Sequence, residues 1–268
     1  MISGRTVIGR CGFPAMLAVV TAALSVTAAM AQSESGHKGG QASAAPVVLI
    51  TGANRGIGLE LAREYSAAGW QVIGTARRPE NAKELRGLGA EVMQLDVTDQ
   101  DSVDRLARDL DGRSLDLLVN NAGIQLLMWK LEDVDIGKFD RMLAVNTVGP
   151  VRVTRALLPN LRSGKRKLIV NMTSDISSIA DNKSGGFYGY RESKTALNMF
   201  TRSLAAELGP DGFICIALHP GWVKTDMGGP NAPISVQESV NGIVKVVDKL
   251  SSADNGTFLT YAGERMAW

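Results

Sequence analysis

Tyr190 and Lys194, four positions apart, are the strongest candidates for chemistry in this sequence. They open a predicted helix, and residues four apart on a helix share a face. A phenol ordinarily titrates at about pH 10, and a neighbouring ammonium favours the phenolate. Tyr190 is therefore a candidate proton donor whose pKa Lys194 tunes. Because this spacing also occurs by chance, with the lysine reaching to water, it needs support from the rest of the chain.

Ser174 follows an apolar run at 167–172 that reads as a buried strand. At the end of a strand, its hydroxyl could hold a substrate oxygen as that oxygen gains charge, which is what carbonyl chemistry requires.

A glycine-rich turn joins another buried strand, predicted at 46–50, to a helix. Gly52, Gly56 and Gly58 lie in this turn with the spacing G-x-x-x-G-x-G. Strand, glycine turn and helix in this order form an anion site, since glycines admit the ligand close to the backbone and the helix N-terminus supplies N–H groups. The alternative is that the glycines only make a tight turn.

These motifs together resemble the short-chain dehydrogenase/reductase family, and the resemblance extends over residues 46–268. The glycine turn is similar to that family's cofactor loop, and Tyr190 and Lys194 match its Tyr-x-x-x-Lys. The tract at 178–186 and the ending at Trp268 resemble the C-factor branch of its carbonyl-reductase-like members. We therefore expect one doubly wound α/β (Rossmann) domain, with a mostly parallel seven-stranded sheet and helices on both faces.

The resemblance implies two possible positions for the active-site serine. The family's strand-ending Asn-x-Ser-Ser matches residues 171–174 and selects Ser174, whereas the commoner spacing to the tyrosine selects Ser177. We prefer Ser174, because strand ends face the ligand crevice of an open α/β sheet and Gly185 and Gly186 can absorb extra residues.

The resemblance also implies a role for each member of the site. Ser174 would hold the carbonyl oxygen and Tyr190 would protonate it. Lys194 would tune Tyr190 and bind the nicotinamide ribose. Asn146, a polar residue in the apolar long helix expected after position 134, would support a proton relay to the lysine.

The cofactor preference is predicted from the charges after the strand expected at 71–76. An NAD site usually places an acid there, whereas NADP needs cations for its 2′-phosphate. Arg77 follows this strand, and Arg55 of the glycine loop could reach the same phosphate, so NADP(H) is favoured. The alternative is that both arginines are only solvated surface residues.

Further cofactor contacts are expected at other strand ends. Asp96 would contact the adenine, although it could equally be a turn residue. The family's Asn-Asn-Ala-Gly matches 120–123, and Thr225 would hydrogen-bond the nicotinamide carboxamide. The predicted cofactor-binding set is Gly52, Asn54, Arg55, Gly56, Ile57, Gly58, Arg77, Asp96, Val97, Asn121, Ala122, Gly123, Tyr190, Lys194, Pro220, Gly221, Val223 and Thr225.

Local signals also predict helix starts. Thr98 is expected to cap the helix after Asp96, and Ser235 with Glu238 to form a capping box for the last long helix. His219, at a strand end, is expected to be structural.

Composition limits the alternatives. The chain has 268 residues with a formal net charge of +2, which fits one enzyme-sized domain and gives no basic surface for nucleic acid. With two cysteines and two histidines it offers no disulfide framework or metal cluster, so no metal is predicted.

The first 45 residues differ from the rest. Arg5 and Arg10 precede an apolar stretch at 13–29 that ends in Ala29-Met30-Ala31, the layout of a signal peptide over 1–31. A flexible linker is expected at 32–45. Export to the periplasm would follow. An uncleaved anchor and a cytoplasmic protein that starts at Met30 are the alternatives.

We therefore expect an NADP(H)-dependent oxidoreductase that transfers hydride between NADPH and a ketone or aldehyde of a small-molecule substrate. A non-catalytic nucleotide-binding or signalling protein on the same fold is the alternative. The resemblance also implies a homodimer or homotetramer, formed through the helices that carry Asn146 and Tyr190.

Overall fold

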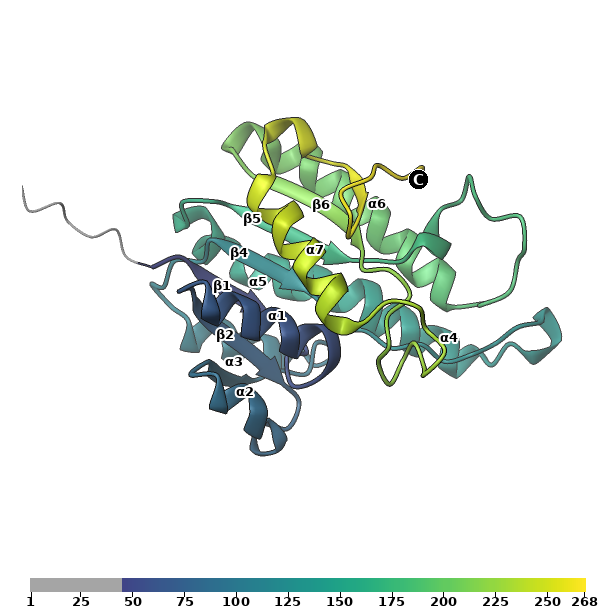
Figure 1. Cartoon of the computed structure of the whole chain (residues 1–268), viewed down its shortest axis with the longest axis horizontal. Coiled ribbons are helices and arrows are strands. Elements are labelled where there is room, and N and C mark those ends of the chain that lie inside the picture. Colours follow the sequence, from purple (N-terminus) through teal and green to yellow (C-terminus); the bar gives the residue numbers. More distant parts are fainter. Residues whose placement is uncertain (1–44) are drawn as a thin grey trace, which may run out of the picture. The chain divides into compact units, whose positions relative to one another are not determined.

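A seven-stranded parallel sheet forms the centre of the computed structural model, which describes residues 45–268 (Figure 1). The predicted signal peptide and nearly all of the predicted linker lie outside the described residues. The strands are β1 Val47–Ile50, β2 Gln71–Ala76, β3 Glu91–Gln94, β4 Leu117–Asn120, β5 Leu168–Met172, β6 Ile214–His219 and β7 Phe258–Thr260. Their spatial order is β3-β2-β1-β4-β5-β6-β7, and every neighbouring pair is parallel. This doubly wound order confirms the predicted fold.

Helices cover both faces of the sheet. Helices α1, α2 and α7 contribute to the hydrophobic core on one face, and α3, α5 and α6 to the core on the other. The helices are α1 Gly56–Ala67, α2 Lys83–Gly87, α3 Gln100–Asp109, α4 Ile136–Leu143, α5 Gly149–Ser163, α6 Tyr190–Leu208 and α7 Val236–Lys249. In β1, Val48 and Ile50 face the first core, and Val47 and Leu49 face the second. A strand buried on both faces needs apolar side chains at every position, which explains its continuous apolar run.

The cap of α3 corrects the expectation for Thr98. Asp99 caps this helix, because its side chain accepts a hydrogen bond from the Asp101 N–H at 3.1 Å. The Thr98 hydroxyl instead donates to Asp96 at 2.7 Å, and Thr98 lies one position before the cap because the helix begins at Gln100. At α7 the Ser235 half of the predicted capping box is confirmed, since the Ser235 hydroxyl accepts from the Glu238 N–H at 3.1 Å.

The long helix expected after position 134 is interrupted. A π-helical turn, η3 Ala144–Val148, separates α4 from α5 and carries Asn146. Pro150 explains the break, because it has no N–H to donate to the carbonyl of Asn146 four positions earlier. Such turns often occur at functional sites.

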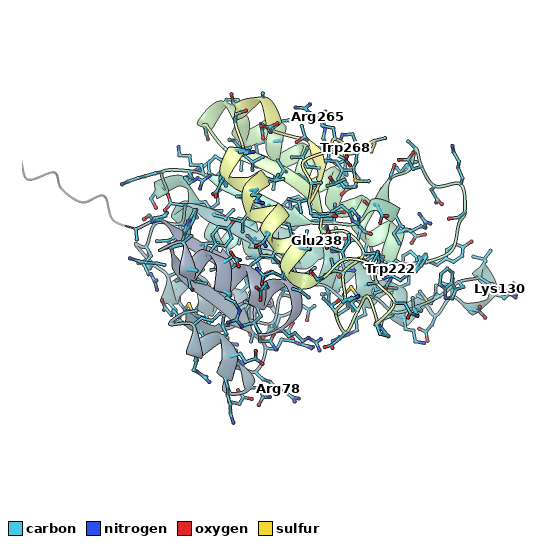
Figure 2. All side chains as sticks on the ribbon, viewed as in Figure 1. Arg78, Lys130, Trp222, Glu238, Arg265 and Trp268 are labelled. Carbon is cyan, nitrogen blue, oxygen red and sulfur yellow. The ribbon has the colours of Figure 1, made fainter. Side chains whose placement is uncertain are left out.

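Three long connections lie at the carboxyl edge of the sheet. They are residues 121–135 after β4, 173–189 after β5 and 220–235 after β6. Lys130 of the first and Trp222 of the third lie toward the same end of the domain (Figure 2). Over residues 45–268, no helix combines the length and apolar character needed to span a membrane.

Candidate active site

A cavity of about 380 Å³ lies between the glycine loop and the ends of the central strands. Many of the predicted site residues line it: Gly52, Arg55, Gly56, Ile57, Gly58, Asn121, Ala122, Gly123, Tyr190, Lys194, Pro220 and Thr225. The other predicted cofactor residues are not among its lining residues: Asn54, Arg77, Asp96, Val97, Gly221 and Val223. The glycine loop and the Tyr-x-x-x-Lys pair, which lie more than 130 positions apart in the chain, therefore share one cavity.

Close packing explains the glycines of the loop. A Cβ on Gly58 would lie 2.5 Å from the Gly52 carbonyl oxygen and 2.6 Å from Nδ2 of Asn121. Gly52 and Gly56 have φ of +65° and +54°, which favour glycine. The Asn121 side chain donates to the carbonyls of Thr51 (2.9 Å) and Gly52 (3.1 Å), so it braces the loop from the neighbouring strand. Gly52, Gly56 and Gly58 thus form a glycine cradle in which a ligand can approach the backbone closely.

The structure separates the two candidate serines by burial. Ser174 is partly exposed and its side chain lies close enough to Tyr190 to lower the pKa of that phenol. Ser177 is 1% exposed, donates to the Ser174 carbonyl and accepts from the Asn198 amide at 2.8 Å. Because its hydroxyl is occupied inside the protein, Ser177 supports the loop. Ser174 is the serine that the structure brings to Tyr190.

The pKa of Tyr190 differs from expectation. Burial raises it to about 12, the hydrogen bond with Ser174 lowers it in part, and the negative Asp175 raises it. The Nζ atom of Lys194 donates to the Met172 carbonyl at 2.7 Å and lies 6.0 Å from the Tyr190 ring centroid. Lys194 is not among the groups that shift the pKa of Tyr190, so the expected lowering by the ammonium is not seen in the protein alone, where removal of the phenol from water dominates.

Burial also lowers the pKa of Lys194, from 10.5 to about 8. In the unfolded chain the ammonium titrates at its ordinary value, so from about pH 8 to about pH 10.5 the unfolded state binds more protons. The free energy of unfolding should therefore rise with pH across this window as the charged form disappears. Chemical denaturation at pH 8, 9 and 10 should show the wild-type protein gaining stability relative to Lys194→Met, a difference in which the other titrating groups largely cancel. A constant difference would contradict the shift.

Asn146 is fully buried and all its polar atoms have partners. Its Oδ1 accepts from the Ile124 N–H at 2.8 Å, and its Nδ2 donates to the Ile124 carbonyl at 2.8 Å and to the Ser193 hydroxyl at 3.0 Å. A Cβ on Gly123 would lie 3.3 Å from Asn146 Oδ1 and 3.5 Å from Lys194 Nζ. Asn146 therefore joins the π-helical turn to α6 next to the lysine.

Four predicted cofactor residues interact with other groups of the protein. The guanidinium of Arg55 pairs with Asp226 at 2.9 Å, and because both side chains are largely exposed the pair is weak. The Thr225 hydroxyl accepts from the Gly228 N–H at 3.1 Å. Burial raises the pKa of the Asp96 carboxyl, but two hydrogen bonds from Thr98 and the nearby charges of Arg77 and Arg141 outweigh it, so the pKa is lowered overall.

Sequence reasoning missed Arg191, directly after Tyr190. Its guanidinium is buried and donates to the carbonyls of Ile176 (2.8 Å), Gly185 (3.1 Å) and Gly186 (3.1 Å) and to the Ser184 hydroxyl (3.0 Å). It therefore fastens both ends of the loop between β5 and α6 to the helix that begins at Tyr190. An arginine within the Tyr-x-x-x-Lys motif was the available signal.

Comparison with known proteins identifies the family. Residues 46–233 match the family model of the short chain dehydrogenases. The chain is 46% identical over 154 residues to C-signal of Myxococcus xanthus, and the match covers 58% of this chain and 93% of that protein. Carbonyl reductase Sniffer of D. melanogaster has 37% identity and a TM-score of 0.79, covering 84% of this chain and all of that chain. NADPH-bound carbonyl reductase from chicken fatty liver has 35% identity and a TM-score of 0.77, and the match covers 84% of this chain and 99% of that chain. With its glycine cradle and Tyr190–Lys194 pair in one cavity, the chain belongs to the short-chain dehydrogenase/reductase family, in its carbonyl-reductase-like branch.

Proposed function

We propose that this protein is an NADPH-dependent carbonyl reductase that converts a ketone or aldehyde to the alcohol. The observation that carries the proposal is the shared cavity, in which Tyr190, with Ser174 close enough to influence its pKa, lies with Lys194 beside the glycine cradle. A proton donor and an oxygen-holding hydroxyl next to a dinucleotide site are what carbonyl reduction needs.

The residues present fit a dinucleotide. The cradle of Gly52, Gly56 and Gly58 leaves backbone exposed at the start of α1, where N–H groups and the helix dipole favour a diphosphate. Lys194 lines the same cavity and would bind the nicotinamide ribose. When bound, the reduced nicotinamide supplies a hydride to the carbonyl carbon. In this mechanism Ser174 holds the carbonyl oxygen, Tyr190 gives it a proton, and Asn146 maintains the region around Lys194 through which that proton is replaced.

Two arginines support NADPH over NADH. Arg77 follows β2 at the position where an NAD site usually has an acid, and Arg55 lies in the glycine loop. The solved relative from chicken fatty liver is a carbonyl reductase with NADPH bound, which supports the same preference here. The exposed Asp226 that pairs with Arg55 can give way to a phosphate, since a weak surface pair costs little to break.

A direct assay tests the activity. Purified protein should oxidise NADPH, followed by the loss of nicotinamide absorbance, with at least some members of a panel of aliphatic and aromatic aldehydes, ketones and diketones. If the protein binds NADPH but oxidises it with none of the panel, the proposal is contradicted and the non-catalytic nucleotide-binding alternative is supported.

Replacement of Arg77 by Ala tests the cofactor preference. A charge-assisted contact to the 2′-phosphate would be lost, so we expect the KM for NADPH to rise about tenfold or more while the KM for NADH changes little. Arg78→Ala is the matched control, because Arg78 is the exposed arginine next to it. Equal effects of the two variants, or equal effects on both cofactors, would contradict the assignment.

A further inference from the structure

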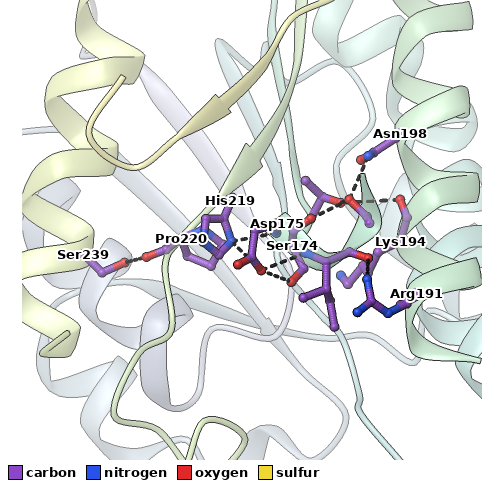
Figure 3. Close-up of polar contacts among 11 residues, drawn as sticks. Ser174, Asp175, Arg191, Lys194, Asn198, His219, Pro220 and Ser239 are labelled. Atoms are coloured by element: carbon purple, nitrogen blue, oxygen red, sulfur yellow. Dashed lines mark hydrogen bonds and ion pairs between the residues drawn. The ribbon is translucent and has the colours of Figure 1, made fainter. Parts of the chain in front are cut away.

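Asp175 places a carboxylate directly beside the proposed oxygen-holding serine. Its Oδ1 accepts from the Ser174 hydroxyl at 3.0 Å and from the Ile176 N–H at 2.8 Å, at the start of the short helical turn η4 Asp175–Ser177 (Figure 3). Half of its side chain remains exposed to solvent (53%). The carboxylate is therefore held in place by the backbone and is still accessible to a small molecule.

The direction of the Ser174 hydrogen bond matters. An ionised carboxylate only accepts, so the single hydroxyl proton of Ser174 is directed at Asp175. Because a carbonyl oxygen also only accepts, Ser174 must leave Asp175 before it can donate to such a substrate. Asp175 and the substrate oxygen thus compete for one proton.

The charge of Asp175 is not cancelled by its neighbours. The Asp175 N–H donates to Nδ1 of His219 at 3.0 Å, which requires a neutral imidazole with its proton on Nε2 (Figure 3). The cations of α6 are engaged elsewhere: Lys194 on the Met172 carbonyl and Arg191 on carbonyls of the 176–186 loop. Within residues 45–268, His219 is the only partner in ion-pair range of Asp175.

We propose that Asp175 is a specificity-determining residue that selects carbonyl substrates bearing a hydrogen-bond donor, such as a hydroxyl group, on the carbon next to the carbonyl. This inference rests on the proposed function and adds the substrate class. The two oxygens of such a hydroxycarbonyl lie about one hydrogen-bond length apart, matching the neighbouring Ser174 and Asp175 oxygens.

In this arrangement the hydroxyl of the substrate takes the place of the Ser174 hydroxyl as the hydrogen-bond donor to Asp175. The Ser174 proton is thereby released to the carbonyl oxygen. The carbonyl carbon receives a hydride, Tyr190 gives the oxygen a proton, and the products are a 1,2-diol and NADP⁺. A ketone without such a hydroxyl draws the Ser174 proton away from Asp175 and gives the carboxylate no donor in its place. A 2-oxo acid brings a second negative charge next to an uncompensated one and is rejected.

Three compounds on one skeleton test the inference: 2-hydroxyacetophenone, acetophenone and phenylglyoxylate. For the wild-type protein we expect kcat/KM for 2-hydroxyacetophenone to exceed that for acetophenone about tenfold or more, the effect of one hydrogen bond to a charged group. Asp175→Ala should remove this preference and lower the KM for acetophenone, because Ser174 no longer has a competing acceptor. Calorimetric titration of both ketones into the NADP⁺ complex should show the same loss of preference.

Asp175→Asn separates charge from loop structure. Its side-chain oxygen can still accept from the Ile176 N–H, so η4 should be preserved, while reduction of phenylglyoxylate should rise at least about tenfold. A loop that is merely damaged would not gain an activity. NADPH affinity should stay unchanged in both variants.

Two results would overturn the inference and leave the proposed function intact. One is a wild-type protein that reduces other carbonyls of the panel but shows no preference for 2-hydroxyacetophenone. The other is a preference that persists in Asp175→Ala. Failure to oxidise NADPH with any carbonyl would instead contradict the proposed function, and this inference with it.

Discussion

Tyr190→Phe is expected to reduce kcat for carbonyl reduction by about 10²- to 10⁴-fold, the usual contribution of a positioned proton donor. The substitution removes one oxygen and keeps the ring, which packs against Met128 and Met142 in a small apolar cluster beside the site. NADPH binding should therefore change far less than turnover. Single-turnover oxidation of bound NADPH by an excess of carbonyl substrate measures the effect on chemistry directly.

Tyr261→Phe is the matched control, since it removes the same group from a residue outside the cavity. It should retain near wild-type turnover. If Tyr190→Phe kept more than about a tenth of the wild-type rate, Tyr190 would not be the proton donor and the proposed mechanism would fail.

Gly58→Ala is expected to damage both stability and cofactor binding. Its new methyl group would meet the Gly52 carbonyl oxygen at 2.5 Å and Nδ2 of Asn121 at 2.6 Å. To make room, Asn121 would have to give up its bonds to the loop carbonyls, so overpacking and lost hydrogen bonds together should lower the free energy of unfolding by at least about 2 kcal/mol. Chemical denaturation measures this loss, and titration with NADPH should show affinity reduced by at least about a hundredfold.

Gly87→Ala provides the comparison. Gly87 is an exposed glycine in α2 with no atom within 4 Å of an added Cβ, so alanine should be neutral or slightly stabilising there. A Gly58→Ala protein as stable as Gly87→Ala, with unchanged NADPH affinity, would show that the loop can relax and that close packing does not require this glycine.

Local patterns in the sequence predicted most of the fold. The apolar run at β1 leads into the glycine loop, and this order of elements appears in the structure as predicted. The helix caps were predicted less reliably, because Thr98 and Asp99 are both good capping residues and the sequence does not fix the exact residue at which α3 begins. The break in the helix at Asn146 was also missed, although Pro150 was visible in the sequence.

Contacts across the sheet could not be read from the sequence. Asp175 meets His219, 44 positions away, because the pairing of β5 with β6 places Met172 opposite Leu218. The residues just beyond these paired positions therefore come together, and no spacing in the sequence records that register. The burial of the site residues could not be read from the sequence either. It makes Lys194 easier to deprotonate and Tyr190 harder to ionise, opposite to the expectation for Tyr190 from the pair alone.

The guanidinium of Arg191 has a consequence for how this protein could acquire new activities. Because it anchors Ile176 at one end of the loop and Ser184 to Gly186 at the other, the exposed residues 179–183 form an outer segment between two fixed points. Exchange or insertion of sequence there would reshape the cover of the site without changing the distance between Ser174 and Tyr190. Evolution, or an engineer, can diversify this segment while the reactive groups stay in place.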